Sequence, residues 1–290
     1  MSDIAQCWIN GEVIPANQAK VSVFDHGFLY GDGIFEGIRF YNKRVFRLPL
    51  HMARLKRSAR ALQIEVPLDD QAFTDAIYAT INACPMPDGY LRVLVTRGVG
   101  ALGINPANCA KPSVIIIADK LVMVGEEERN KGLRAIIAST RRMTADRLDP
   151  RIKSLNYLNA IQAKMEANYS GVDEAILLNE RGFVTEGSAM NIFVVRDGTL
   201  HTPPATEGAL QGITRGTVLE VAKELGIPAF ETVLTPYDLF TADECFFTGT
   251  GAKLIPIREI DGRKVGACPG EIYAKLLAGF NALVARETTG

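Results

Sequence analysis

One lysine of the chain, Lys153, has neighbours that are unusual for a lysine on the protein surface. It belongs to the stretch RIKSLNYLNA, residues 151–160, and the side chains that follow it are apolar or small and polar. Apolar surroundings or nearby cations lower the proton affinity of a lysine amine and make it nucleophilic. The stretch therefore allows two interpretations, an ordinary surface lysine or an amine used for chemistry.

A nucleophilic lysine most often forms a Schiff base with pyridoxal phosphate (PLP), and this cofactor has three further requirements. It needs an acid beside its pyridine nitrogen, donors for its phosphate and a hydrogen bond to its phenolic oxygen. Glu186 ends an apolar strand and precedes small residues, so it is a candidate for the acid. Tyr157, four residues after Lys153, would lie near the lysine if both were helical.

Three segments are candidates for binding a phosphate. Gly212, Ile213 and Thr214 begin a predicted helix, whose first N–H groups attract anions. The small-residue turn TGTG, residues 248–251, could present N–H groups in the same way. Arg54 is one of five basic residues between positions 51 and 60. A helix cap, a β-turn and a solvated arginine are equally ordinary interpretations, so these patterns alone leave the alternatives open.

Composition excludes several classes of function. The 290 residues carry a formal net charge of −1, so no basic excess indicates nucleic acid. The histidines (His26, His51, His201) lack metal-site spacing, and we expect no metal. The scattered cysteines (Cys7, Cys84, Cys109, Cys245, Cys268) are typical of reduced thiols in the cytoplasm. We expect no signal peptide and no membrane span.

The apolar periodicity predicts an α+β protein with two domains. Residues 1–121 form a small N-terminal domain, 122–132 a charged linker, and 133–290 a larger C-terminal domain. Hairpins are expected at Asn10-Gly11 and Asn42-Lys43. The predicted helices span residues 50–62, 70–83, 155–169, 214–225 and 270–284.

The stretch GVGALG, residues 98–103, matches the glycine pattern of dinucleotide-binding folds. That function requires a helix directly after the glycines, to bind the pyrophosphate. Here INPANCAKPS follows, with two prolines and no room for a crossover helix. We therefore interpret the segment as a connection between antiparallel strands, which could also cover a substrate.

Taken together, the segments resemble the class IV (fold-type IV) PLP-dependent aminotransferases along nearly the whole chain. The pieces are YGDGIFEGIR, HMARLKRSA, YLRVLVTRG, IKSLNYLNA, DEAILLNERGFVTEGSAMNIF, GITR and TADECFFTGTGAKLIPI. The resemblance implies a small α/β domain, a larger mixed-sheet, barrel-like domain that binds PLP, and a Schiff base at Lys153. It also implies cofactor binding by Arg54, Tyr157, Glu186, Leu210, Ile213, Thr214 and Thr250.

Within this family the chain is most similar to branched-chain amino acid aminotransferases, through FEGIR and YLR. By this resemblance Tyr30, Phe35 and Tyr90 line the side-chain pocket, and Arg92 and Gly251 support the substrate carboxylate. Arg39 is a candidate for the γ-carboxylate of 2-oxoglutarate, although a structural arginine fits as well. D-amino acid aminotransferases carry an arginine and a histidine in the 98–106 loop, and this chain has neither.

The expected reaction transfers an amino group from Leu, Ile or Val to 2-oxoglutarate. Small molecules are then the only substrates, without nucleic acid or membrane, and the family implies a homodimer or a dimer-based oligomer. The family's usual pattern differs at Ala189, Met190, Gly251 and Lys253, which leaves D-amino acids or (R)-amines as alternative substrates. Aminodeoxychorismate lyase and a non-catalytic relative are further alternatives.

Overall fold

The computed structural model describes residues 4–121 and 125–289, and they divide into two compact units. The first contains residues 4–121, 152–156 and 287–289, and the second contains 125–151 and 157–286. Lys153 thus belongs to the first unit by its contacts. Of the predicted linker, residues 122–124 lie outside the described residues, and Glu126–Lys131 form helix α4.

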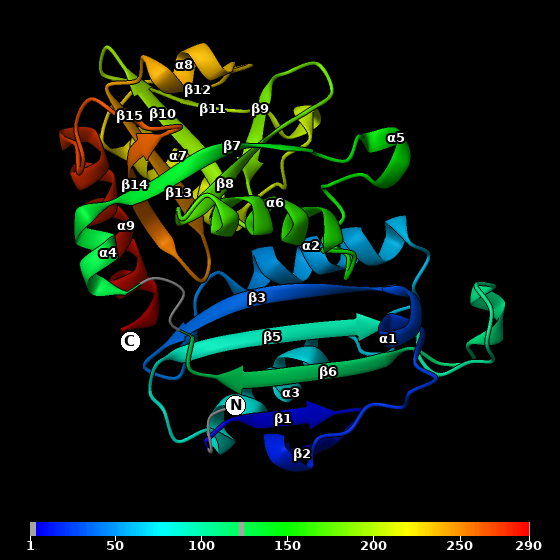
Figure 1. Cartoon of the computed structure of the whole chain (residues 1–290). Coiled ribbons are helices and arrows are strands. Elements are labelled where there is room, and N and C mark those ends of the chain that lie inside the picture. The colour runs from blue at the N-terminus through cyan, green and yellow to red at the C-terminus, as the bar shows by residue number, and fades with distance from the viewer. Residues whose placement is uncertain (1–3, 122–124, 290) are drawn as a thin grey trace. The chain divides into compact units, whose positions relative to one another are not determined.

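The first unit is built on an antiparallel sheet with the strand order β2-β1-β6-β5-β3-β4 (Figure 1). Its elements are β1 (Gln6–Ile9), β2 (Glu12–Pro15), α1 (His26–Tyr30), β3 (Gly33–Tyr41), β4 (Arg44–Val45), α2 (Leu48–Ala61), α3 (Asp70–Ala83), β5 (Gly89–Thr96) and β6 (Ser113–Asp119). Both predicted hairpin turns are confirmed, with left-handed backbone at Asn10 and at Asn42. β5 and β6 pair antiparallel, as we predicted when rejecting the dinucleotide motif between them.

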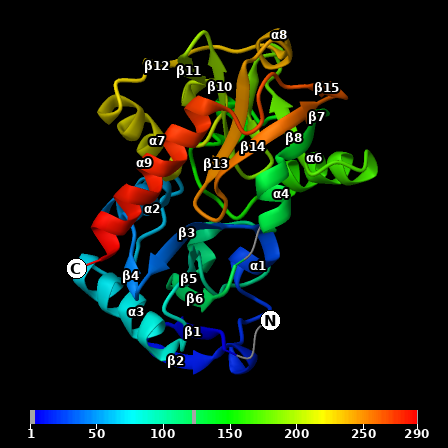
Figure 2. The same ribbon diagram turned by 90° about the vertical axis from the view of Figure 1, so that its left-hand side faces the viewer.

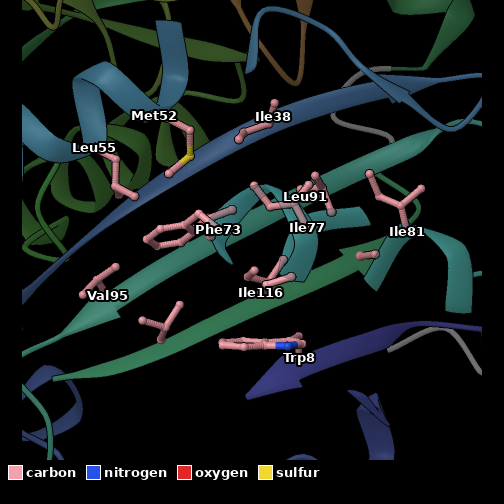
Figure 3. Close-up of a cluster of buried hydrophobic side chains, with 14 of the residues drawn as sticks. Trp8, Ile38, Met52, Leu55, Phe73, Ile77, Ile81, Leu91, Val95 and Ile116 are labelled. Carbon is pink, nitrogen blue, oxygen red and sulfur yellow. The ribbon is translucent and has the colours of Figure 1, made fainter. Parts of the chain in front are cut away.

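The core of the first unit lies between one face of this sheet and the helices α2 and α3 (Figure 3). Alternate residues of β3 and β5 point into it, among them Ile38 and Leu91, and the helices contribute Leu55, Phe73 and Ile77. Side chains alternate between the faces of a strand. The residues between these core positions, such as Phe35 and Arg92, therefore lie on the opposite face.

The second unit contains a larger mixed sheet in the order β12-β11-β10-β13-β14-β7-β8-β9, with β15 paired to β14. Its strands are β7 (Leu133–Arg141), β8 (Glu174–Leu178), β9 (Val184–Gly187), β10 (Asn191–Arg196), β11 (Thr199–Thr202), β12 (Ala229–Glu231), β13 (Glu244–Gly249), β14 (Lys253–Ile260) and β15 (Arg263–Lys264). β7 pairs parallel with both β14 and β8, whereas β10, β13 and β14 are antiparallel. β9, at one end of the order, contacts β10, so the sheet curls upon itself.

Helices cover this sheet and connect its strands (Figure 2). They are α4, α5 (Ala145–Leu148), α6 (Leu158–Tyr169), α7 (Ile213–Glu224), α8 (Pro236–Phe240) and α9 (Glu271–Thr288). α6 packs on β7 and β8 through alanines, and Tyr273 of α9 packs against Phe246 of β13. Each unit thus combines helices with a sheet, and the predicted α+β class is confirmed. No helix within the described residues is long and apolar enough to cross a membrane.

Two local predictions need correction. The helix expected from residue 155 begins at Leu158, so Lys153 and Tyr157 do not lie one helical turn apart. Residues 152–156 stay outside the helix because they bond to β3, and this tertiary contact was invisible in the local pattern. The short helices α1, α5 and α8 were not predicted, since four or five residues carry too little periodicity.

Candidate active site

The main chain of Lys153 is bound on two sides within the first unit. The Phe35 N–H of β3 donates to the Lys153 carbonyl at 2.9 Å, and Leu155 N–H donates to the Gly33 carbonyl at 2.9 Å. From the other side, Lys153 N–H donates to Ser58 Oγ of α2 at 3.1 Å. The lysine therefore lies in a non-helical segment along β3, whose main chain is held by a strand and a helix.

The Lys153 side chain lies on the face of β3 that is opposite the core. Its Nζ is 4.5 Å from the centre of the Phe35 ring, and the Arg92 guanidinium is 4.4 Å from the same ring. Arg39 lies over Tyr90 at 5.9 Å. The first unit thus brings five predicted residues together as a cationic and aromatic face.

Gly37 is required for this arrangement. A Cβ added there would come within 1.9 Å of Tyr90 Oη, because the tyrosine lies directly over the glycine. Tyr30, by contrast, is on α1, where its hydroxyl accepts a hydrogen bond from Gly103 N–H at 2.9 Å. The residue predicted beside Phe35 and Tyr90 is therefore bound to the loop that follows β5.

A buried ion pair that sequence reasoning missed lies on the core side of β3. Glu36 accepts hydrogen bonds from Arg54 Nε and Nη2 and from His51 Nδ1, each at 2.7 Å. Burial raises the pKa of the Glu36 carboxyl, but the charges and hydrogen bonds of Arg54 and His51 outweigh it and lower the pKa to about 2. The sequence did contain a signal for this pair. Glu36 lies midway between Ile34 and Ile38, which are both core positions, and a buried acid requires a buried partner such as a cation.

The candidate acid of the second unit, Glu186, is the last residue but one of β9 and is 4% exposed. Its Oε2 accepts from Asn191 Nδ2 and from Leu210 N–H, both at 3.0 Å. Its Oε1 lies 2.6 Å from Arg142 Nη2. Donors on both oxygens match an ionised carboxylate, which is the form that a pyridinium nitrogen would bind.

The candidate phosphate-binding residues of this unit lie at two main-chain turns. Gly212 is the N-cap of α7, and Ile213 and Thr214 form its first turn. A Cβ on Gly212 would meet Asn191 Oδ1 at 2.0 Å, so only glycine fits between this amide and the helix. Thr250 and Gly251 form the tight turn between β13 and β14, closed by Ala252 N–H donating to the Gly249 carbonyl at 3.0 Å.

Comparison with known proteins decides the family. Residues 33–260 match the family model for class IV aminotransferases (Amino-transferase class IV). The chain belongs to this family.

A protein of Methanocaldococcus jannaschii is 49% identical over 275 residues, which cover 94% of each chain. The crystal structure of the Escherichia coli branched-chain amino acid aminotransferase is 36% identical and covers 98% of this chain and 95% of its own, with a TM-score of 0.93. The crystal structure of the branched-chain amino acid aminotransferase from Thermobaculum terrenum in its PLP-form is 31% identical. It covers 97% of this chain and 94% of its own, with a TM-score of 0.87.

These similarities confirm three predictions for this class IV aminotransferase: the family, the fold-type IV architecture and PLP as cofactor. The residues present fit PLP chemically. The first unit supplies an amine next to an aromatic ring and a buried guanidinium. The second supplies a buried carboxylate and the N-terminus of a helix of 12 residues.

The unusual residues of this aminotransferase have ordinary places in the fold. Met190 is buried in the core of the second unit, and its carbonyl accepts from Gly187 N–H at 2.7 Å. Lys253 begins β14 with a left-handed backbone, φ 60°. The described residues contain no cluster of side chains suited to a metal ion.

Proposed function

We propose that this aminotransferase transfers the amino group of a branched-chain L-amino acid (Leu, Ile or Val) to 2-oxoglutarate, giving the 2-oxo acid and L-glutamate. The observation that carries the proposal is near-full-length similarity, at 36% identity, to enzymes named branched-chain-amino-acid aminotransferase. A pocket for both substrates must accept an apolar side chain and a carboxylate. The face formed by Phe35, Tyr90, Arg39 and Arg92 combines both properties.

Lys153 is the catalytic residue of this proposal. When bound, PLP supplies an electron sink that stabilises negative charge at the substrate Cα. Lys153 would hold the cofactor through Nζ, and the same amine, when free, would take the proton from the substrate Cα as general base and deliver it as general acid to the other carbon that changes its protonation in the reaction. The hydrogen bonds of its carbonyl and its N–H hold the Lys153 main chain in place, and so limit where its amine can reach.

The other residues bind and orient. Glu186 binds the pyridine nitrogen, and Arg142, Asn191 and Leu210 N–H orient its carboxylate. Arg54 binds the phosphate. The remaining assignments are Ile213, Thr214, Thr250 and Leu210 for cofactor, Tyr157 for the phenolic oxygen, Tyr30, Phe35 and Tyr90 for the substrate side chain, Arg92 and Gly251 for its carboxylate, and Arg39 for the γ-carboxylate.

An absorption titration of the purified enzyme tests the proposal. With L-leucine, absorbance of the lysine-bound cofactor at about 410–420 nm should give way to pyridoxamine phosphate at about 325–330 nm, and 2-oxoglutarate should reverse the change. A response to D-alanine or an (R)-amine but not to L-leucine would reject the branched-chain assignment. Absence of a visible band after addition of PLP would reject the role of Lys153.

We also propose that the enzyme works in the cytoplasm as a homodimer or dimer-based oligomer. The five cysteines are free thiols, as is usual in a reducing compartment. Leu158, Ile161, Met165 and Tyr169 form an exposed apolar row on α6, a feature typical of protein contact surfaces. Sedimentation analysis of the holoenzyme should give at least twice the monomer mass, and a monomer would reject the assembly.

A further inference from the structure

Glu36, His51 and Arg54 form a cluster in which every side chain is almost completely buried, here called the Glu36 cluster. Their exposed fractions are 0%, 1% and 3%. Glu36 comes from β3, whereas His51 and Arg54 lie three residues apart on α2. The proposed function assigns a role to Arg54 and none to the glutamate that it contacts.

Stability is a poor explanation for this cluster. Removing a carboxylate and a guanidinium from water costs several kcal/mol per ion, and their attraction recovers this only with very good geometry. Apolar residues of similar volume would fill the same core position at least as well. Burial raises the pKa of Glu36, but the charges and hydrogen bonds of Arg54 and His51 lower it to about 2. The carboxylate is therefore ionised at neutral pH.

The geometry of the contact supplies a better explanation. Glu36 Oε1 accepts from Arg54 Nε and Oε2 from Arg54 Nη2, each at 2.7 Å. A bidentate contact fixes both the position and the plane of a guanidinium, which a single hydrogen bond does not. The direction of the third nitrogen, Nη1, is then determined by Glu36, and His51 Nδ1 at 2.7 Å from Oε2 fixes the carboxylate itself.

The elements that carry the Glu36 cluster also carry Lys153. Phe35, the neighbour of Glu36 on β3, donates its N–H to the Lys153 carbonyl. Ser58, one turn after Arg54 on α2, accepts the Lys153 N–H. One strand and one helix therefore determine both the position of the Lys153 main chain and the orientation of the Arg54 guanidinium.

We propose that Glu36 is a positioning residue that aims Arg54 at the phosphate of PLP. The inference rests on the proposed role of Arg54 in phosphate binding. Without the bidentate contact Arg54 would still carry its charge, but its N–H groups would no longer have a fixed direction. Glu36 thus acts on phosphate recognition through Arg54 and touches neither cofactor nor substrate.

The test compares the affinities for PLP and for pyridoxal, which is the same aldehyde without its phosphate. Dissociation constants are measured from the visible absorbance of apoenzyme titrated with each compound. Glu36→Gln should weaken PLP about 10–100-fold, as loss of an orienting outer partner typically does, and change pyridoxal by less than about twofold. Glu36→Asp keeps the charge but is too short for both contacts, so its loss should be intermediate.

A matched control separates positioning from folding. Glu244 is also buried, at 6% exposure, and accepts from the N–H groups of Ile272 and Tyr273 at the start of α9. Glu244→Gln should lower thermal stability without changing the ratio of the two dissociation constants. If Glu36→Gln does not fold, Glu36→Asp decides the question by the same ratio.

Two negative outcomes have different meanings. If the wild-type chain binds PLP no more tightly than pyridoxal, phosphate recognition by Arg54 fails, and the role of Glu36 fails with it. If the wild type prefers PLP strongly and both Glu36 variants keep that preference, the proposed function stands and the positioning role is overturned.

Discussion

Two buried carboxylates, Glu36 in the first unit and Glu186 in the second, each form an ion pair with an arginine, but their partners differ. Glu36 receives its hydrogen bonds from two residues on one turn of α2. Glu186 receives them from the end of β7, from β10 and from the loop before α7, through Arg142, Asn191 and Leu210. The first cluster forms when one helix packs on one strand, whereas the second requires most of the large sheet to be assembled.

The comparison teaches which substitution should cost more stability and which should cost more turnover. Glu36 faces the core and neutralises a guanidinium that has little other access to water, since Arg54 is 3% exposed. Glu186 is held partly by neutral donors, which orient a carboxylate without neutralising it. We therefore expect loss of Glu36 to affect stability most, and loss of Glu186 to affect turnover most.

The largest expected effect is the loss of stability in Glu36→Gln. Leaving Arg54 buried without its anion should lower the free energy of unfolding by about 3–5 kcal/mol. Urea denaturation of the apoenzyme, followed by circular dichroism, measures this difference. A loss below about 1 kcal/mol, which is typical of an exposed ion pair, would contradict the comparison.

Glu186→Gln should have the next largest effect, on turnover rather than on stability. Removing an electrostatic contact on which a reaction relies typically lowers kcat about 10²–10³-fold. The amide oxygen of the variant can still accept from Asn191 Nδ2 and Leu210 N–H, while its NH2 group replaces the oxygen beside Arg142, so the variant should fold and bind PLP. Steady-state kinetics with L-leucine and 2-oxoglutarate measure kcat. A variant with normal turnover but reduced stability would reverse the roles of the two carboxylates.

The acid dependence of stability sharpens the same contrast. Because the folded-state pKa of Glu36 is about 2, below its unfolded value of about 4.3, its contribution is complete above the unfolded pKa and is lost as pH falls toward the folded pKa. The stability difference between wild type and Glu36→Gln should therefore be constant near neutral pH and shrink between about pH 4.3 and about pH 2. Denaturation curves of both proteins at several pH values measure it. A difference independent of pH would show that the charge of Glu36 does not matter.

The contrast also explains how much the sequence could predict. The apolar alternation of β3 and β5 and the periodicity of α2 and α3 predicted these elements, because each is long enough to display its period. Glu186, Lys153 and Arg54 were candidates from the local pattern, and the resemblance to a family assigned their roles. Glu36 was missed because its partners became evident only when α2 was packed on β3.

The non-helical conformation of the segment around Lys153 was unpredictable for the same kind of reason. Local propensity predicted a helix over residues 155–169. Hydrogen bonds with Gly33 and Phe35 keep residues 152–156 out of that helix. Tertiary hydrogen bonds of this sort routinely override local preference. The local sequence singled out the lysine and the family resemblance assigned its role, whereas only the structure gives the contacts of its main chain.

Arg142→Met tests the support of Glu186 and should have a smaller effect than loss of the carboxylate. The variant removes one charged donor, at 2.6 Å from Oε1, and leaves Asn191 and Leu210 N–H on Oε2. Loss of a hydrogen bond to a charged group costs about 1.5–3 kcal/mol, so kcat should fall about tenfold or somewhat more. Arg142→Lys, which retains the charge, should recover part of the loss. If both variants reduce stability and leave kcat unchanged, Arg142 serves the fold alone.

Ser58→Ala is the smallest change and tests the contact between α2, which carries two residues of the Glu36 cluster, and the main chain of Lys153. Ser58 is 2% exposed, and its hydroxyl accepts the Lys153 N–H at 3.1 Å. The substitution leaves that N–H without this acceptor, which should cost about 1 kcal/mol of stability. Because the strand contact through Phe35 remains, Lys153 should keep its place, and kcat should fall by no more than about fivefold, the kinetic equivalent of about 1 kcal/mol. Thr80→Val is a suitable control, because it removes a buried hydroxyl that donates within α3, to the Ala76 carbonyl. Ser58→Ala could instead lower kcat as much as Glu186→Gln does. That result would mean that α2, and not β3, determines where the amine lies. Residues of the first unit would then matter as much for turnover as residues of the second.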